Sequence, residues 1–467
     1  MSETLFTLAI AIALASSAFA ALHAILYKRD VRAAIGWAGF IIVAPYLGPL
    51  IYLLFGVNRI RRRAGSLRAD ERRSASPASS LLPELHESLA NQALLGDRVC
   101  NNRFHPGNRI EVLDGGERAF PAMLQSIDAA QRRIAIATYI FEHDSLGRRF
   151  VDALAAATRR GVEVRVLLDA VGSRSRRPDI LAALASHGVR AALFLPPRNP
   201  VGILAINLRN HRKLTIVDDA IAFTGGLNLS GDYAAAAGAE RTFRDIHFSV
   251  DGPVVAELQR VFAADWFFAT RERLDPAQTP PERDEGMPAR VVADGPDEGF
   301  ERTRWLILGA IAMARRSVRI VTPYFLPDMS LITALNVAAL RGVAIEILIP
   351  ERLDHAPVKW ASNALLWQVL DKGCRIWFTP APFDHSKLFT VDGLWTLIGS
   401  SNWDARSLRL NFELNVEIAG SEMARRVDAL IDERRSRGRP VTLEQIDARP
   451  LPVRVRDGLA RLFTPYL

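Results

Sequence analysis

The stretch that decides the fold occurs twice in this chain, as His211-Arg212-Lys213-Leu214-Thr215-Ile216-Val217-Asp218 and as His385-Ser386-Lys387-Leu388-Phe389-Thr390-Val391-Asp392. In each copy the Asp lies seven residues after the His, and an Asn follows seventeen residues after the His, at Asn228 and Asn402. A single His-x-Lys pattern is weak evidence, because most such pairs are solvated strand residues. Two copies with matched spacings indicate a duplicated functional site.

Each copy has the pattern of a β-hairpin. Residues 213–217 form one predicted strand and residues 221–224 the returning strand, and residues 387–398 repeat the pattern. A His and a Lys two positions apart on a strand point to the same face, and the returning strand brings the Gly-rich turn and its Asn alongside them. Asp218 and Asp392 lie at the far end of the hairpins, so we expect these two motif residues to form the turns.

The two motifs together supply two His, two Lys and two Asn side chains. Lysine and amide donors suit the non-bridging oxygens of a phosphodiester, and one imidazole can attack phosphorus while the other protonates the departing alkoxide. The six motif residues form the candidate catalytic set, namely His211, Lys213, Asp218, His385, Lys387 and Asp392. The candidate phosphate ligands are Asn228, Asn402 and the hydroxyl of Ser400, which replaces Gly226 of the first copy. Neither motif has a second His or Cys at ligand spacing, so we expect no metal and no cofactor.

Helices alternate with apolar strands around both motifs. The first series comprises residues 119–130, 133–139 and 162–168, and the second comprises residues 304–314, 318–324 and 343–349. This alternation predicts an α/β fold made of two duplicated α/β/α sandwich halves, residues 108–285 and 286–467, which share one active-site cleft.

The N-terminal part is typical of a membrane anchor. Residues 4–27 and 33–58 contain no charged residue, and each run exceeds the roughly 20 residues that span a bilayer. We expect an uncleaved transmembrane helical hairpin within residues 1–58. The alternative is a secretory signal peptide, but no basic residue precedes the first apolar run. Pro45 leaves a broken or re-entrant second segment open as well.

An arginine-rich tract follows the second apolar run. Residues 59–107 read as a basic juxtamembrane linker, and its first fifteen residues hold seven arginines. By the positive-inside rule this density keeps the rest of the chain in the cytoplasm. One feature disagrees with a simple hairpin, since the connection between the two apolar runs holds Lys28, Arg29 and Arg32 and would have to lie outside.

The composition narrows the partners but does not select one. The formal charge of +8 and the pI near 9.8 favour a polyanion, and both nucleic acid and an anionic lipid surface meet that condition. The two cysteines, Cys100 and Cys374, provide neither a disulfide framework nor a thiolate metal cluster.

The duplicated HxKxxxxD pattern, followed each time by GxxN or its Ser-containing variant, resembles the phospholipase D superfamily. With two N-terminal apolar segments before the motifs, the whole chain resembles the bacterial cardiolipin synthases. That resemblance implies that two phosphatidylglycerol molecules yield cardiolipin and glycerol through a phosphatidyl-histidine, with His211 as nucleophile and His385 as general acid and base. It also implies anionic phospholipids and the bacterial inner membrane as partners, a multi-pass anchor, a cytoplasmic catalytic domain and no nucleic-acid substrate.

The resemblance further implies an acidic residue that orients each histidine. The match in the second half is Glu413, and the corresponding acid in the first half is Asp245, although their distances from the motif of the same half differ. Three alternatives stay open on the residues alone. They are a phospholipase D-type hydrolase that uses water, a nuclease of the same superfamily and a non-enzymatic membrane scaffold.

Overall fold

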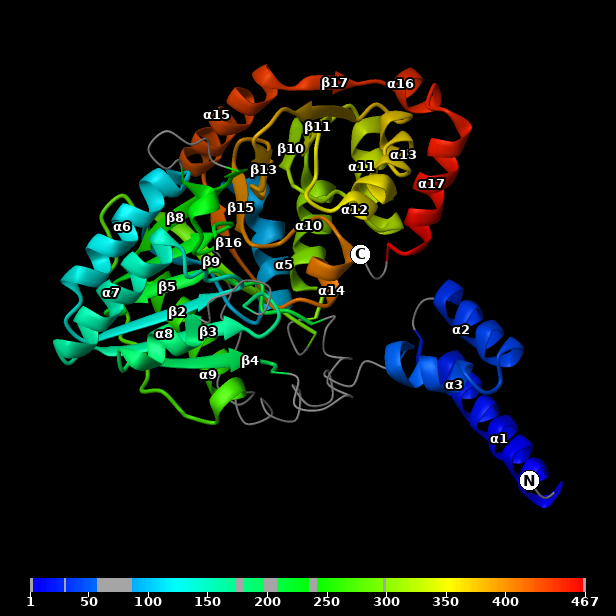
Figure 1. Cartoon of the computed structure of the whole chain (residues 1–467). Coiled ribbons are helices and arrows are strands. Elements are labelled where there is room, and N and C mark those ends of the chain that lie inside the picture. Colours follow the sequence, from blue (N-terminus) through cyan, green and yellow to red (C-terminus); the bar gives the residue numbers. More distant parts are fainter. Residues whose placement is uncertain are drawn as a thin grey trace. The chain divides into compact units, whose positions relative to one another are not determined.

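The structure is a computed structural model, and it describes residues 3–28, 31–56, 86–173, 180–196, 208–234, 242–296 and 300–464. The chain divides into two compact units (Figure 1). The smaller unit comprises residues 1–69 with 199–204, and the larger unit, which we call the body, comprises residues 70–198 and 205–467.

The smaller unit contains the helices α1 (Glu3–Tyr27), α2 (Val31–Val43), α3 (Gly48–Ile51) and the π-helix η1 (Tyr52–Gly56). Among the described residues, α1 is the one helix that is long and apolar enough to cross a membrane. The second apolar run differs from the predicted span. Its main helix, α2, has 13 residues and ends before Pro45, so it is about 20 Å long, against a hydrocarbon core of about 30 Å.

The chain turns back on itself after α2. A Cβ on Gly48 would lie 2.6 Å from Cα of Ile41, so only glycine allows this close approach. The rings of Tyr52 and Trp37 lie 5.2 Å apart although fifteen residues separate them in sequence, and a continuous helix would separate them by about 22 Å. Residues 48–56 therefore return alongside α2 instead of continuing its path.

Most described strands of the body form one 15-stranded sheet in the order β17-β12-β11-β10-β14-β15-β16-β9-β1-β8-β6-β5-β2-β3-β4. Two short strands, β7 (Phe243–Arg244) and β13 (Phe383–Asp384), pair in parallel as a separate two-stranded sheet. The first half contributes β1 (His105–Asp114), β2 (Arg133–Thr138), β3 (Glu163–Asp169), β4 (Arg190–Phe194), β5 (Leu214–Val217), β6 (Ile221–Gly225) and β8 (Ile246–Asp251). The second half contributes β9 (Met287–Asp294), β10 (Ser317–Val321), β11 (Ala344–Pro350), β12 (Arg375–Thr379), β14 (Leu388–Val391), β15 (Trp395–Gly399), β16 (Glu413–Ala419) and β17 (Arg439–Val441). The two halves are mirrored in this order and meet where β1 pairs with β9.

Both motif hairpins form as the sequence predicted. β5 pairs antiparallel with β6, with Leu214 opposite Thr224, and β14 pairs with β15, with Leu388 opposite Ile398. In each half the first motif strand is also antiparallel to β2 or β10, which begins a parallel run of three strands. The motifs thus lie inside the sheet, where their neighbours on both sides fix their position.

Helices cover both faces of the sheet (Figure 1). Those of the first half are α6 (Gly116–Ala129), α7 (Ser145–Arg159), α8 (Ile180–Ser186) and α9 (Val254–Thr270), with the short η5 (Gly231–Tyr233). Those of the second half are α10 (Arg302–Met313), α11 (Met329–Leu340), α12 (Ala356–Asn363), α13 (Trp367–Leu370), α14 (Ala405–Arg409), α15 (Ser421–Arg437), α16 (Leu443–Asp447) and α17 (Leu451–Leu462). Each half has its own hydrophobic core, and a further core joins α9 and α15 to strands of both halves. The predicted duplicated α/β architecture is confirmed.

Part of the predicted linker is helical. Residues 57–85 lie outside the described residues, whereas η3 (Glu87–Leu89) and α5 (Ala90–Cys100) pack into the core of the second half. The buried Arg290 holds α5 by donating from Nη1 to Asp97 Oδ1 at 2.7 Å, and its Nη2 donates to Glu417 Oε2 at 2.6 Å. The domain limits given above stay predictions.

Candidate active site

The two histidines come together where the halves meet. The backbone N–H of His211 donates to the carbonyl of Phe412 at 2.9 Å, and that of His385 donates to the carbonyl of Arg244 at 2.6 Å. Each motif is therefore attached at its histidine to the opposite half. The centroids of the two imidazole rings lie 6.5 Å apart. A single site thus contains both motifs, as the sequence predicted.

The acidic partners of the histidines are exchanged between the halves. Nδ1 of His211 lies 3.1 Å from Oε2 of Glu413, and Nδ1 of His385 lies 2.7 Å from Oδ2 of Asp245. From the sequence, each acid was related only to the motif of its own half, whereas in the structure each acid contacts the histidine of the other half. Both carboxylates are fully buried. Because each acid occupies Nδ1, Nε2 of each ring is left for a substrate.

The positions of the two acids explain the difference between the Gly-rich turns. A Cβ on Gly226 would lie 2.2 Å from both carboxylate oxygens of Asp245, so no side chain fits there. In the second half Ser400 occupies the equivalent place and donates its hydroxyl proton to Glu413. The same hydroxyl oxygen accepts from the N–H of Leu414 at 3.0 Å. A hydroxyl has one proton, and Glu413 accepts it here, so the role of Ser400 as a phosphate donor stays a prediction.

Both lysines are buried beside the histidines. Nζ of Lys213 donates to the carbonyl of His211 at 2.8 Å, and Nζ of Lys387 donates in the same way to the carbonyl of His385. Burial lowers the pKa of Lys213 to about 7 and that of Lys387 to about 8, although the nearby carboxylates work against this shift. A bound anion would favour the charged form of both side chains.

The two histidine–acid pairs differ in electrostatics. Burial works to raise the pKa of Glu413, but His211 and Lys213 hold that pKa below its usual value. Burial raises the pKa of Asp245 to about 7, even though Lys387 opposes the shift. Burial also lowers the pKa of both histidines, most strongly for His385, where Lys387 and Lys213 add to the effect.

The two asparagines are not equivalent. Nδ2 of Asn228 donates to the hydroxyl of Tyr233 at 3.0 Å, and its Oδ1 accepts from the N–H of Ile140 at 3.3 Å. Asn402 is also buried, but within the described residues its Oδ1 has no hydrogen-bond partner. The side chain of Asn402 is therefore the freer of the two to turn toward a ligand.

The motif aspartates lie at the far end of the hairpins, away from the histidines. Asp218 accepts hydrogen bonds from the backbone N–H groups of Gln131, Arg132 and Arg133 at 2.7–2.9 Å. Asp392 accepts the equivalent three from residues 315–317 at 2.7–2.9 Å. Each aspartate has a positive φ, of 52° and 55° respectively, and so both forms the turn and fastens it to the start of the neighbouring strand.

Several site residues were not singled out from the sequence. Arg212, inside the first motif, is almost fully buried, and it donates from Nε to the carbonyl of Glu413 at 3.0 Å and from Nη1 to Asp265. Aromatic rings surround the histidines, with the Tyr139 ring 5.3 Å from His211 and the Tyr324 ring 6.3 Å from His385. The matched positions of these tyrosines after strands β2 and β10 were the available signal.

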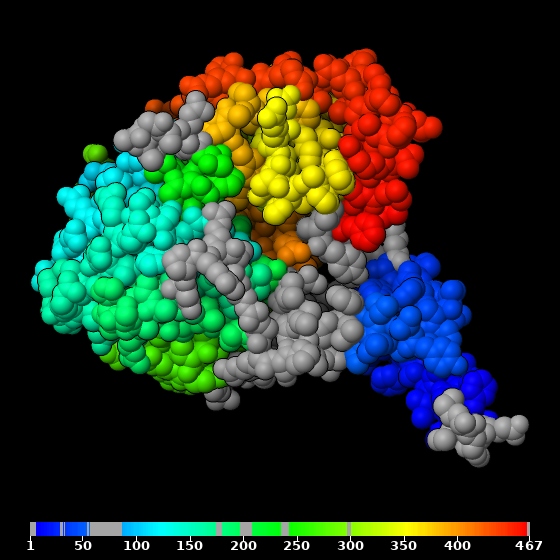
Figure 2. Space-filling model, viewed as in Figure 1, coloured from blue at the N-terminus to red at the C-terminus, as the bar shows by residue number. Residues whose placement is uncertain are grey.

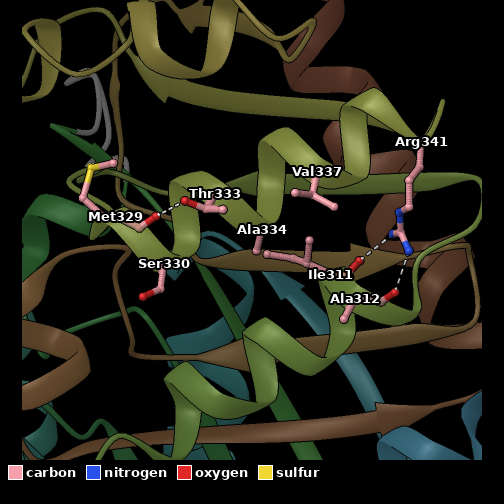
Figure 3. Close-up of a pocket in the computed structure, with 8 residues that line it drawn as sticks. All are labelled: Ile311, Ala312, Met329, Ser330, Thr333, Ala334, Val337 and Arg341. Carbon is pink, nitrogen blue, oxygen red and sulfur yellow. Dashed lines mark hydrogen bonds between the residues drawn. The ribbon is translucent and has the colours of Figure 1, made fainter.

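One surface groove of the body lies apart from this site. It has a volume of about 530 Å³ and lies between α10 and α11, lined by residues such as Ala312, Met329, Val337 and Arg341 (Figure 3). None of the motif residues lines it. Within the described residues there is also no group of three or more His, Cys, Asp and Glu side chains that could hold a metal ion.

Comparison with known proteins gives consistent matches along the chain. The family model described as "Cardiolipin synthase, PLD-like domain" matches residues 123–266 and again 307–435, and one described as "Phospholipase D-nuclease N-terminal" matches residues 16–56. The cardiolipin synthase of Geobacillus thermodenitrificans is 33% identical, over 95% of this chain and 90% of that protein. The major cardiolipin synthase of Bacillus subtilis is 32% identical, over 94% of this chain and 95% of that protein. Cardiolipin synthase A of Pseudomonas aeruginosa is 35% identical, over 88% and 86%.

Among solved structures, the phosphatidylserine synthase of Haemophilus influenzae is similar in fold. The TM-score is 0.63, and the match covers 81% of this chain and all of that chain at 14% identity. This likeness agrees with the duplicated α/β architecture.

Proposed function

Because this chain belongs to the cardiolipin synthase family of phospholipase D-like phosphatidyltransferases, we propose that it joins two phosphatidylglycerol molecules into cardiolipin and glycerol through a phosphohistidine. The observation that carries this proposal is the pair of imidazole rings 6.5 Å apart, each held at Nδ1 by a buried carboxylate of the other half. Two such rings can act on opposite sides of one phosphorus atom.

The first step would break the bond between phosphorus and the glycerol headgroup of the donor lipid. Nε2 of His211 attacks phosphorus with its lone pair, a P–N bond forms, and the P–O bond to the headgroup breaks. Nε2–H of His385 gives its proton to the departing oxygen, so glycerol leaves as a neutral alcohol. The phosphatidyl group is then bound to His211.

The second step would reverse this chemistry with a new alcohol. His385, now able to accept a proton at Nε2, deprotonates a headgroup hydroxyl of a second phosphatidylglycerol. The resulting oxygen nucleophile attacks phosphorus, the P–N bond breaks, and cardiolipin leaves with His211 restored. No metal and no cofactor is needed for the balance of atoms and charge.

The unlike acids support this division of roles. Glu413, with its lowered pKa, is ionised at neutral pH and accepts the Nδ1 proton of His211, which leaves the lone pair on Nε2. Asp245, with a pKa of about 7, can hold or release a proton as His385 loses and regains its own. A nucleophilic histidine needs an acid that stays ionised, as Glu413 does. A histidine that acts as general acid and base needs an acid that can hold or release a proton, as Asp245 can.

The lysines and asparagines would stabilise the charge on phosphorus. Lys213 and Lys387 lie on the histidine face of the two hairpins, and Asn402 and Asn228 come from the returning turns. Donors already in place in a dry site contribute strongly to such a step, and removal of one donor typically costs on the order of 10²–10³ in rate.

The test is product analysis by mass spectrometry with purified protein, phosphatidylglycerol vesicles and EDTA. We expect cardiolipin and glycerol from the wild type, and a loss on the order of 10³-fold or more from His211→Ala and from His385→Ala. Quenching in alkali, which preserves phosphohistidine, should place the phosphatidyl group on the peptide that contains residue 211. Phosphatidic acid without cardiolipin would identify a hydrolase, and no lipid turnover would contradict the proposal altogether.

The chain is associated with the membrane, and we place it in the bacterial inner membrane with the body in the cytoplasm. The sequence predicted a multi-pass anchor, but contacts within the smaller unit favour one crossing by α1. Oγ of Ser17 donates to the carbonyl of Pro45 at 2.9 Å, and Ser17 lies about 15 Å along α1 from its Tyr27 end. Further along the chain, the hydroxyl of Tyr52 lies 2.8 Å from Nδ1 of His23, which is closer to the Tyr27 end of α1 than Ser17 is.

Residues 31–56 would therefore enter about half of the bilayer and return to the same side. This topology removes the conflict in the charge distribution, because Lys28, Arg29, Arg32 and the arginine tract then all face the cytoplasm. A full second crossing would place the first three outside.

Labelling of single cysteines in intact cells distinguishes the two topologies. The native Cys100 and Cys374 are buried, so a membrane-impermeant maleimide should not reach them. With one crossing, Ser2→Cys is labelled from the periplasm, whereas Arg149→Cys in the body is not. An unlabelled Ser2→Cys that becomes reactive after lysis would show two crossings instead.

A further inference from the structure

Exposed apolar side chains are unevenly distributed over the body. Within its described residues, every large hydrophobic side chain that is strongly exposed belongs to the second half. These side chains are Trp305, Met329, Val337, Leu340, Trp367, Leu451, Val455, Leu459, Leu462 and Phe463. Five of the ten belong to α17 or to the residue that follows it. Figure 2 shows this C-terminal segment, in red, at the surface beside the yellow segment of the second half.

The apolar residues of α17 form one stripe. Leu451, Val455, Leu459 and Leu462 follow each other at intervals of four, four and three residues, so they share one face of the helix. Each is between 51% and 72% exposed. A single exposed leucine needs no explanation, but four in register on one helix mark an interaction surface.

The body holds α17 so that this stripe faces outward. Asp457, on the opposite face, is fully buried, and its Oδ2 accepts from Nη1 of Arg449 at 2.6 Å. Arg456 donates to the same carboxylate at 2.7 Å, and its guanidinium lies 4.6 Å from the centroid of the Trp360 ring on α12. The helix also packs along α12 (Figure 1). The exposed stripe is therefore a fixed feature of the fold and not a frayed end.

Two arginines lie beside the apolar stripe of α17. Arg454 and Arg461 are exposed on one side of it, and neither forms an ion pair in the part of the chain that the structure describes. An apolar stripe beside arginines is the pattern of a helix that lies in the surface of an anionic membrane. A buried protein interface would instead leave these two charges to be desolvated or paired.

The duplication provides an internal comparison. The family-model match of the second half ends at residue 435, so α17 lies beyond the repeated unit. On α7 in the first half, the exposed positions are occupied by polar or charged residues, among them Arg148, Arg149 and Asp152. The motif-bearing fold thus does not require an exposed apolar helix face.

We propose that α17 is a docking helix that inserts its apolar stripe into the surface of an anionic bilayer, with Arg454 and Arg461 at the lipid phosphates. It would hold the second half of the body on the membrane in addition to the anchor in α1. This inference rests on the proposed function in one respect, namely that the bilayer supplies the substrate.

The direct test measures the depth of α17 in the full-length protein in phosphatidylglycerol-containing proteoliposomes. A Val455→Cys variant carries a polarity-sensitive fluorophore, and Arg149→Cys on α7 is the matched control, because the two native cysteines are buried. We expect the label at position 455 to be quenched by lipids with a spin label on the acyl chain, and the label at position 149 to be unaffected. An unquenched label at position 455 would overturn the proposal. A label that is shielded in dilute detergent as well would point to a second copy of the chain and would also overturn it.

Activity provides the second readout. The Leu459→Gln/Leu462→Gln variant should lose about tenfold in turnover of bilayer phosphatidylglycerol but keep wild-type turnover of a short-chain, monomeric phosphatidylglycerol. The Arg149→Gln variant should change neither rate. Equal rates of the double variant and the wild type on bilayers would contradict docking by α17. Failure of the wild type on both the bilayer and the short-chain lipid would instead contradict the proposed function, so the two failures are distinguishable.

Discussion

At the scale of single residues, the site is a set of buried charges that stabilise one another. Lys213 and Lys387 lie beside Glu413 and Asp245, and burial moves the pKa of both lysines and of Asp245 toward neutrality. Such a set is costly to fold without a ligand, and it becomes favourable when an anionic phosphodiester enters. The same residues therefore link the activity to pH.

The rate should fall on the alkaline side between about pH 7 and pH 8. In the proposed mechanism the lysines hold the substrate phosphate only when protonated, and their pKa values are about 7 for Lys213 and about 8 for Lys387. As the pH rises through these values, each lysine loses its charge and kcat/KM decreases. The measurement is a pH profile of cardiolipin formation. In Lys213→Arg, whose guanidinium stays charged, the alkaline limb should move to higher pH even if the maximal rate is lower. A limb unchanged in that variant would exclude Lys213 as its origin.

Gly226→Ala should abolish most activity without unfolding the protein. The added Cβ would meet the carboxylate of Asp245 at 2.2 Å and displace it from His385. We expect a loss on the order of 10²-fold in kcat with native circular dichroism, since misplacement of a catalytic group by about 1 Å has such an effect. Gly458→Ala is the matched control, because no atom lies within 4 Å of the added Cβ there. Wild-type activity of Gly226→Ala would show that Asp245 does not need its present position.

At the scale of single elements, each motif hairpin is stabilised by the aspartate in its turn. The carboxylate of Asp392 accepts three backbone N–H groups at the start of β10, and Asp218 does the same at the start of β2. These residues belong to the motif because they position the strand that carries His and Lys, while their own side chains lie away from the rings.

Asp392→Ala should therefore lower stability more than it lowers the intrinsic rate. Loss of the carboxylate leaves three backbone N–H donors without this acceptor, which is expected to cost about 2–4 kcal/mol of unfolding free energy. Asp392→Asn keeps one acceptor oxygen and tolerates the positive φ, so we expect a smaller cost of about 1 kcal/mol. Denaturant unfolding of the purified full-length variants checks both losses of unfolding free energy. The kcat is measured at denaturant concentrations well below the unfolding transition. A loss of kcat on the order of 10³-fold in a stably folded Asp392→Asn would instead give this aspartate a chemical role.

At the scale of the whole molecule, neither half contains a complete site. His211 has its acid on β16 of the second half, and His385 has its acid immediately before β8 in the first half. Arg212 adds a third connection, from the first motif to the backbone of Glu413. The candidate catalytic groups thus come together only when the two halves share their common core.

The exchanged pairs predict the phenotypes of the acid variants. Glu413→Gln should impair the nucleophile and reduce the phosphohistidine on residue 211 in a rapid-quench experiment. Asp245→Asn should resemble His385→Ala, with slowed proton transfer and a changed pH profile. We expect losses of about 10²–10⁴-fold in kcat for each. If Asp245→Asn impaired His211 selectively, each acid would serve the histidine of its own half, which would contradict the exchanged pairing.

Much of this protein follows from local sequence spacing alone. The period of two in the motifs, the turn residues and the matched Asn positions determined the hairpins and the shared face of His and Lys, because strand pairing across a short turn depends on neighbouring residues. The chemistry of two imidazoles and two lysines indicated phosphodiester transfer, and the repeated alternation of helices and strands indicated two α/β halves. The long apolar run of α1 indicated membrane attachment.

Other features were decided only by the tertiary structure. The partner of each acid depends on how two halves pack across α9 and α15, and separation in sequence carries no information about that packing. The sequence offered the hydroxyl of Ser400 as a phosphate donor, but in the fold this hydroxyl donates to Glu413. The second apolar run was long enough to span, yet Gly48 lets the chain turn back against Ile41. In each case local pattern determined which groups were present, and long-range contacts determined which of them meet, because burial and hydrogen bonding between distant segments act only after the chain has folded.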